Sequence, residues 1–140
     1  MFAVCCHHKC TWHETVGRYW LEHEAKITSD EFALITHLSS WAVCGFNRKS
    51  TEQVNDNGSI DSLNQNYLEA LKSDNKEECQ NALYNLDVSV KVRIGKICKS
   101  LIDWGRLMYM KHELNLSNVF SATYTTSDIT PENIVICGSK

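Results

Sequence analysis

The chain has 140 residues, of which 43% are hydrophobic and 22% are charged, a composition that fits one globular domain with a modest core. Its net charge of −3 excludes an overall basic field for nucleic-acid binding, although a local basic patch is compatible with that charge. No apolar run approaches the roughly 20 residues of a membrane span, and the start MFAVCCHHK lacks the features of a signal peptide. With seven cysteines at irregular spacing, we expect an intracellular location, nuclear or cytoplasmic, and no membrane partner.

The first predicted elements are a strand and a helix. The segment from Phe2 to Cys6 is short, apolar and β-compatible, which predicts a buried strand. Thr11 is followed three residues later by Glu14, the spacing of a capping box. Apolar side chains at helical spacing then predict a helix from Trp12 to Ala25.

A second helix and a polar segment follow. Ser29 or Asp30 is expected to cap the second helix, which should end at Gly45, a typical residue just after a helix. Asn, Ser, Asp, Gln and Gly dominate from Phe46 to Asn66, which predicts a mobile surface loop over about 46–66. Residues Tyr67 to Leu86 have the apolar spacing of one or two further helices.

The longest predicted element is an amphipathic helix from Val88 to Leu114. Lys99 and Asp103 are four residues apart, and we expect both on the face opposite the apolar one. Gly95 and Gly105 each weaken a helix interior by up to about 1 kcal/mol, a cost that close packing or a nearby ligand would explain. The predicted apolar face consists of Val90, Ile94, Ile97, Leu101, Trp104 and Met108.

Two strands end the predicted order. Val119 to Thr125 alternates in polarity, and Asn133 to Cys137 is a short apolar run. The turn-forming segment from Ser127 to Pro131 lies between them. This order predicts an antiparallel hairpin that closes the sheet of an α/β protein.

Cysteines and histidines cluster after the first predicted strand. Three of each lie between Cys5 and His13, which raises the possibility of a zinc site. Structural zinc is usually held by two spaced pairs of ligands. Cys6 and Cys10 make one acceptable pair, but a second pair is missing, so the spacing disfavours zinc.

The position of this cluster also suits catalysis. Ligands of α/β proteins bind beyond the carboxyl ends of the strands, where Cys5 to Lys9 would lie. A histidine there is a candidate general base, and Lys9 and Arg18 could hold an anion. A purely structural role is the alternative, because Cys5 and Cys6 could simply pack the end of the strand.

Four blocks of the sequence together resemble a known family. They are FAVCCHHKCTWHETVG, SSWAVCG from Ser39, IGKICKSLIDWGRLMYM from Ile94 and PENIVI from Pro131. In this order and spacing they resemble the C-terminal part of the tRNA methyltransferases that modify the ribose 2′-hydroxyl of nucleotide 4 in the acceptor stem. Residues Gln53 to Leu86 show little resemblance and look like an insertion.

The resemblance implies an α/β fold, the C-terminal portion of a Rossmann-like methyltransferase dependent on S-adenosylmethionine. Phe2 to Cys6 would be a middle parallel strand, and the last two strands would be antiparallel to each other. Family members also carry zinc fingers, a Gly-rich cofactor loop and an acidic residue for the cofactor's ribose, none of which occurs in these 140 residues. We therefore expect a partial methyltransferase domain over residues 1–140, inactive alone, with zinc confined to the missing N-terminal part.

The resemblance also assigns roles within the cluster. His7 or His8 would orient or deprotonate the 2′-hydroxyl, and Lys9 would lie near phosphate. Arg106 would contact RNA or pair with Asp103 at i,i+3, and the ion pair is favoured slightly. The candidate residues are His7, His8 and Cys6 for catalysis, Cys5 for the cofactor, and Lys9, Arg18 and Arg106 for the tRNA acceptor stem.

Two other functions stay open. One is a small zinc-binding interaction module with Cys6 and Cys10 as ligands. The other is a non-catalytic remnant of a methyltransferase that binds a protein or RNA. The oligomeric state is not predicted.

Overall fold

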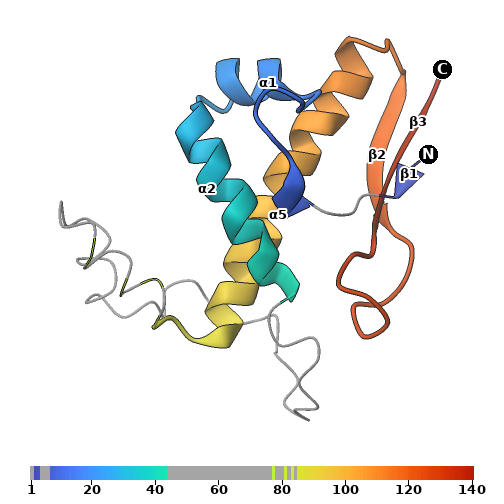
Figure 1. Ribbon diagram of the computed structural model, residues 1–140. Helices are drawn as coiled ribbons and strands as arrows, with labels where there is room; N and C mark the ends of the chain where they lie inside the picture. Colours follow the sequence, from blue (N-terminus) through green and yellow to red (C-terminus); the bar gives the residue numbers. More distant parts are fainter. Residues whose placement is uncertain (1, 4–6, 44–76, 78–80, 82, 84) are drawn as a thin grey trace.

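The fold has three layers, with one long helix in the middle (Figure 1). The computed structural model describes residues 2–3, 7–43, 77, 81, 83 and 85–140. Helices α1 and α2 pack on one side of α5, and a small sheet packs on the other side. The described elements are β1 (Phe2–Ala3), the 3-10 helix η1 (His7–Lys9), α1 (Arg18–His23), α2 (Ser29–Ser39), the 3-10 helix η2 (Ser40–Val43), α5 (Val88–His112), β2 (Asn118–Thr123) and β3 (Ile134–Ser139).

The sheet has the order β1–β3–β2, and β3 is antiparallel to both neighbours. Ala3 pairs with Val135, and Thr123 pairs with Ile134. The predicted antiparallel hairpin is therefore confirmed. Because β1 and β2 are both antiparallel to β3, their carboxyl ends lie at the same edge of the sheet as the start of β3.

The predicted first strand is confirmed only in part. Its described portion is Phe2–Ala3, and residues 4–6 lie outside the described residues. We expected it to be a middle parallel strand, but its described neighbour is the antiparallel β3. The described elements thus establish a mixed α/β fold with an antiparallel sheet, and a Rossmann-like fold remains a proposal.

The first predicted helix is much shorter than expected. Turns replace its first part, and α1 begins only at Arg18. Thr11 Oγ1 donates a hydrogen bond to Glu14 Oε2 (2.7 Å), so the two side chains bind each other rather than cap a helix. Gly17 then brings the chain so close to α5 that a Cβ atom would overlap the backbone of Gly105.

The N-cap of α2 lies one residue earlier than predicted, and it forms a capping box. Thr28 is the N-cap: its side chain accepts from the Glu31 N–H, and the Glu31 carboxylate accepts from the Thr28 N–H at 2.8 Å. The Thr28 N–H and the Thr28 hydroxyl both donate to the Glu31 carboxylate, and these two hydrogen bonds hold the pKa of Glu31 below its usual value. Helix α2 ends at Ser39 and the 3-10 helix η2 follows it, so the α-helix is shorter than predicted. Gly45 itself, the predicted loop over about 46–66 and most of 67–86 lie outside the described residues.

Helix α5 confirms the long predicted helix but buries a different face. Ile97, expected inside, is 55% exposed. Lys99 and Asp103, expected outside, are only 6% and 5% exposed, so that prediction was wrong. The reason is that α5 is covered from two sides, and polar groups from the loops at the sheet edge meet it between them. The buried α5 residues are Gly95, Cys98, Lys99, Ile102, Asp103, Gly105 and Met110.

Both helix glycines mark close packing, which was one of the two predicted explanations. A Cβ atom on Gly95 would overlap the backbone of Ala42 in η2. A Cβ atom on Gly105 would lie 3.0–3.3 Å from the side chain of Leu21. The two glycines therefore let α5 approach η2 and α1 more closely than an alanine would allow.

Two apolar clusters join the layers. Met110 and Ile136 form the core between α5 and the sheet. The core between the helices consists of Leu21, Ile27, Phe32 and Ile102, with Trp12 and Trp104 packed against it. Within the described part of the chain, no helix is both long and apolar enough to cross a membrane.

Candidate functional site

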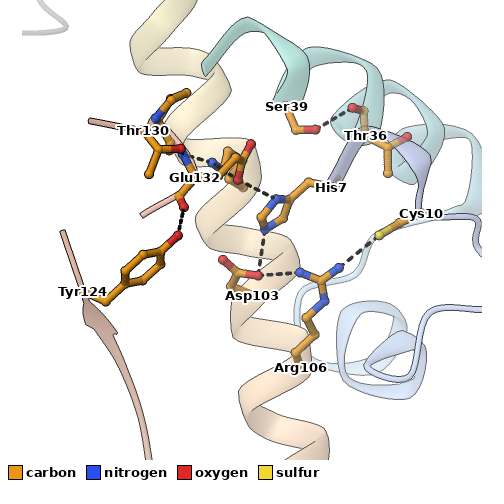
Figure 2. A network of polar contacts seen from close by, with 11 residues as sticks. His7, Cys10, Thr36, Ser39, Asp103, Arg106, Tyr124, Thr130 and Glu132 are labelled. Carbon is orange, nitrogen blue, oxygen red and sulfur yellow. Dashed lines mark hydrogen bonds and ion pairs between the residues drawn. The ribbon is translucent and has the colours of Figure 1, made fainter. Parts of the chain in front are cut away.

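The candidate site lies at the edge of the sheet where β1 and β2 end. Helix η1 follows β1, and the segment Pro131–Asn133 leads into β3. Since β3 starts where β1 ends, the two segments meet at this edge, and α5 passes behind them (Figure 2).

His7 is the buried centre of the site. Its side chain is 2% exposed, and its Nε2 atom forms a 2.8 Å hydrogen bond with Asp103 Oδ1. Because an ionised carboxylate can only accept, Nε2 carries the hydrogen. The other ring nitrogen, Nδ1, is buried and has no hydrogen-bond partner among the residues that the structure describes. His7 thus ties the turn after β1 to α5.

Arg106 shares the same carboxylate. Its Nη1 atom lies 2.7 Å from Asp103 Oδ1, which confirms the predicted i,i+3 ion pair. Its Nη2 atom donates to Cys10 Sγ at 3.1 Å. The guanidinium thus links Cys10, which follows η1, to Asp103 of α5. A contact between Arg106 and RNA stays a prediction.

A second ion pair lies on the other side of His7. Lys99 Nζ is 2.6 Å from Glu132 Oε2 and donates to the carbonyl of Pro131 at 3.1 Å. The same Glu132 oxygen lies 3.7 Å from His7 Nδ1. Lys99, Asp103 and Glu132 therefore form one polar network with His7 (Figure 2).

Lys99 and Glu132 were not among the predicted site residues, and Asp103 was predicted only as the partner of Arg106. Lys99 and Asp103 were read as a solvent-exposed pair, and Glu132 was read only as part of a family block. One signal was present: charged residues that interrupt the apolar run ICKSLIDWGR conflict with a simple amphipathic pattern. That signal does not identify Glu132 as the partner of Lys99, because 33 residues separate them.

Two hydrogen bonds fix the backbone of Glu132. Its N–H donates to Thr130 Oγ1 at 3.2 Å, and its carbonyl accepts from the Tyr124 hydroxyl at 2.6 Å. Asn133 Nδ2 also donates to the Thr125 carbonyl at 3.1 Å. The segment before β3 is thus held in one conformation from both sides.

The remaining predicted residues are exposed or lie outside the described part. His8 and Lys9 are exposed in η1, beside the buried His7, and Arg18 is exposed at the start of α1. Cys5 and Cys6 lie outside the described residues, so their predicted roles stay predictions. The structure therefore joins His7 and Arg106 through Asp103 and leaves His8 and Lys9 facing solvent.

The described cysteines show no metal site. Across residues 7–43 and 85–140, no three His, Cys, Asp or Glu side chains are placed to hold a metal ion. Cys98 is a core residue, and burial raises the pKa of its thiol. The zinc alternative named Cys6, which is outside the described residues, together with Cys10, whose sulfur accepts from Arg106.

The described cavities do not fit an S-adenosylmethionine site at the sheet edge. One, of about 340 Å³, lies between the turns before α1 and the start of α2, next to Trp12 and Thr28. The other, of about 320 Å³, lies beside Arg106 and Thr15. Neither is lined by His8, Lys9 or Glu132, and the second meets the network at Arg106 and Cys10.

Comparison with known proteins places the chain beside one family. The profile of the family described as Methyltransferase TRM13 matches residues 1–139. The chain is similar to the tRNA:m(4)X modification enzyme TRM13 homologs of Homo sapiens, 34% identical over 119 residues and 81% of the chain, and of Dictyostelium discoideum, 31% identical over 141 residues and 99% of the chain. It is also 26% identical to the Saccharomyces cerevisiae tRNA:m(4)X modification enzyme TRM13 over 143 residues, which cover 96% of the chain.

The chain spans about a quarter of the length of these relatives: 24% of the human protein, 26% of the Dictyostelium protein and 27% of the yeast protein. No solved structure matches the chain.

Proposed function

Since the chain belongs to the TRM13 methyltransferase family, we propose that it is the C-terminal part of a tRNA 2′-O-methyltransferase. Its substrate is the ribose 2′-hydroxyl of nucleotide 4 in the tRNA acceptor stem, and its methyl donor is S-adenosylmethionine. The observation that carries the proposal is the family match, which extends over residues 1–139. The relatives are tRNA:m(4)X modification enzymes, and this name supports nucleotide 4 as the position of the methyl group.

The sheet edge suits the part of the reaction that concerns the hydroxyl. A ribose hydroxyl is a poor nucleophile until a base takes its proton. His8 is exposed beside the fixed His7, so His8 is the residue that we assign to this proton. His7 holds the turn through Asp103, and the exposed Lys9 attracts a neighbouring phosphate.

The cofactor pocket belongs to the part of the enzyme that this chain does not contain. Neither of the two described cavities is lined by His8, Lys9 or Glu132, and the sequence has no Gly-rich loop. Cys5 is assigned to the cofactor site, which it would complete together with a Rossmann-like remainder, and Cys6 stays a candidate catalytic residue. The proposed assembly is one active site built from two parts of a longer chain.

Replacement of single histidines in the full-length enzyme tests these roles. His8→Ala should lower methyl transfer to nucleotide 4 by about a hundredfold or more, the usual contribution of a general base. His7→Ala should lower activity together with thermal stability, because it breaks the link to α5. His37→Ala, at an exposed position in the last turn of α2, should change neither.

Two results would contradict the proposal separately. Activity of His8→Ala within a few-fold of the wild type would remove His8 as the base. Nuclease mapping that finds the methyl group at another nucleotide, or on a base, would remove the substrate assignment itself.

A further inference from the structure

Glu132 is a fixed carboxylate with one oxygen already in use and one still available. Lys99 binds Oε2, whereas Oε1 has no partner among the residues that the structure describes. The side chain is 29% exposed, in contrast to the 7% of Lys99 behind it. The backbone on both sides of the carboxylate is held by Thr130 and Tyr124. Glu132 is therefore a hydrogen-bond acceptor in a fixed position, and its Oε1 atom can accept a further hydrogen bond.

His7 provides a second, independent sign of a ligand at this place. Its Nδ1 atom is buried without a partner and lies 3.7 Å from Glu132 Oε2. Buried polar atoms without partners are rare in folded proteins, and they call for an explanation such as a binding role. The orphaned atom therefore lies beside the same carboxylate group, that of Glu132 (Figure 2).

The chemistry of the network selects the class of ligand. A carboxylate repels phosphate, and Lys99 already supplies the cation that this carboxylate needs. The missing partner is thus a neutral hydrogen-bond donor. Such donors on an RNA strand include the ribose hydroxyls, and the exposed Lys9 in the same η1 turn as His7 can hold the adjacent phosphate.

We propose that Glu132 binds a ribose hydroxyl of the substrate tRNA, with Lys99 and His7 as the residues that position it. This inference rests on the proposed function, because it takes the tRNA as the ligand. The Glu132 side chain is 29% exposed, so an RNA strand can reach it from outside. Glu132 is therefore a substrate-contacting residue of the enzyme.

The test is a cycle between protein and RNA in the full-length enzyme. The protein variant is Lys99→Met/Glu132→Leu, which removes both charges together and leaves no buried charge without a partner. The RNA variants carry a single 2′-deoxyribose at nucleotide 3, 4 or 5. The measurement is the tRNA dissociation constant, with the thermal midpoint of each protein recorded alongside it.

In the wild type, one of the three deoxy substitutions should weaken tRNA binding by about tenfold, the usual value of a hydrogen bond to a charged group. In the double variant the same substitution should have no further effect. Glu113→Leu, an exposed control at the end of α5, should keep the wild-type discrimination.

Equal discrimination in the wild type and in the double variant would overturn the inference. So would a double variant that loses affinity for S-adenosylmethionine while its response to deoxyribose stays unchanged. If the double variant does not fold, Glu132→Gln takes its place, because its amide oxygen still accepts from Lys99, and discrimination should then fall only in part. Full discrimination in Glu132→Gln would overturn the inference.

These results can be separated from a failure of the proposed function. A wild-type enzyme that methylates nucleotide 4 but shows no coupling to Glu132 removes the hydroxyl site alone. A wild-type enzyme that transfers no methyl group to nucleotide 4 removes the function itself.

Discussion

Lys99 and Asp103, the buried charged residues in the described part of the chain, are each held by partners of opposite charge and by hydrogen bonds. Asp103 receives His7 and Arg106 on the same oxygen, at 2.8 and 2.7 Å. Lys99 donates hydrogen bonds to the Glu132 carboxylate and to the Pro131 carbonyl. Burial of an unpaired charge would cost several kcal/mol, so each partner depends on the others. The network therefore connects three separate chain segments at the site.

Asp103→Asn should destabilise the protein by about 3 kcal/mol, since it leaves Arg106 half-buried without its counterion and weakens the bond to His7. The measurement is the free energy of unfolding from denaturant titration. Asp128→Asn, in the exposed loop before β3, should change it by less than about 0.5 kcal/mol. A loss below about 1 kcal/mol for Asp103→Asn would show that the network does not support the fold.

Helix α5 is the element on which the whole arrangement depends. It packs against α1 and α2 on one side and against the sheet on the other, and it supplies Lys99, Asp103 and Arg106 to the site. Its two glycines set how closely its neighbours can approach. The position of the network thus follows from the packing of one helix.

Gly95→Ala tests this packing. Alanine normally favours a helix over glycine by about 0.5–1 kcal/mol. At position 95, however, the new methyl group would overlap the backbone of η2, which cannot move like a side chain. We expect a net destabilisation of about 1–3 kcal/mol, measured by thermal or denaturant unfolding.

Gly105→Ala is the matched comparison. Its methyl group would press only on the Leu21 side chain, which can shift by a few tenths of an ångström. The loss should therefore be clearly smaller than for Gly95→Ala. Equal losses, or a stabilised Gly95→Ala, would contradict the close approach of η2 to α5.

At the scale of the whole molecule, the main feature is the open edge of the small sheet at β1. Strand β1 pairs with β3 on one side, and no strand covers its other side among the described residues. An open strand edge pairs readily with another strand. The family relatives are about four times as long, and we propose that their additional part covers this edge and brings the cofactor.

The chain by itself should not bind S-adenosylmethionine. Calorimetric titration of the isolated chain should give no saturable heat, whereas the full-length enzyme should bind under the same conditions. The physical reason is that neither of the two described cavities is lined by His8, Lys9 or Glu132. Clear saturable binding by the isolated chain would show that the cofactor pocket is contained in these 140 residues.

The sequence by itself determined the elements with strong local signals and the family. The long helix, the final hairpin and the i,i+3 pair of Asp103 and Arg106 follow from periodicity, turn residues and spacing within a few positions. Their physical basis is local, so a short window contains it. The four blocks around FAVCCHHKCTWHETVG were enough to indicate the family.

Only the tertiary structure decided which side chains are buried and which ones meet. Periodicity assigns one apolar face to a helix, but α5 has neighbours on two sides, so Lys99 and Asp103 lie inside and Ile97 lies outside. Thr11 and Glu14 have the spacing of a capping box, yet α1 begins only at Arg18, after Gly17 has made its close contact with α5. His7 meets Asp103 across 96 residues, and contacts over such separations depend on the path of the whole chain rather than on local pattern.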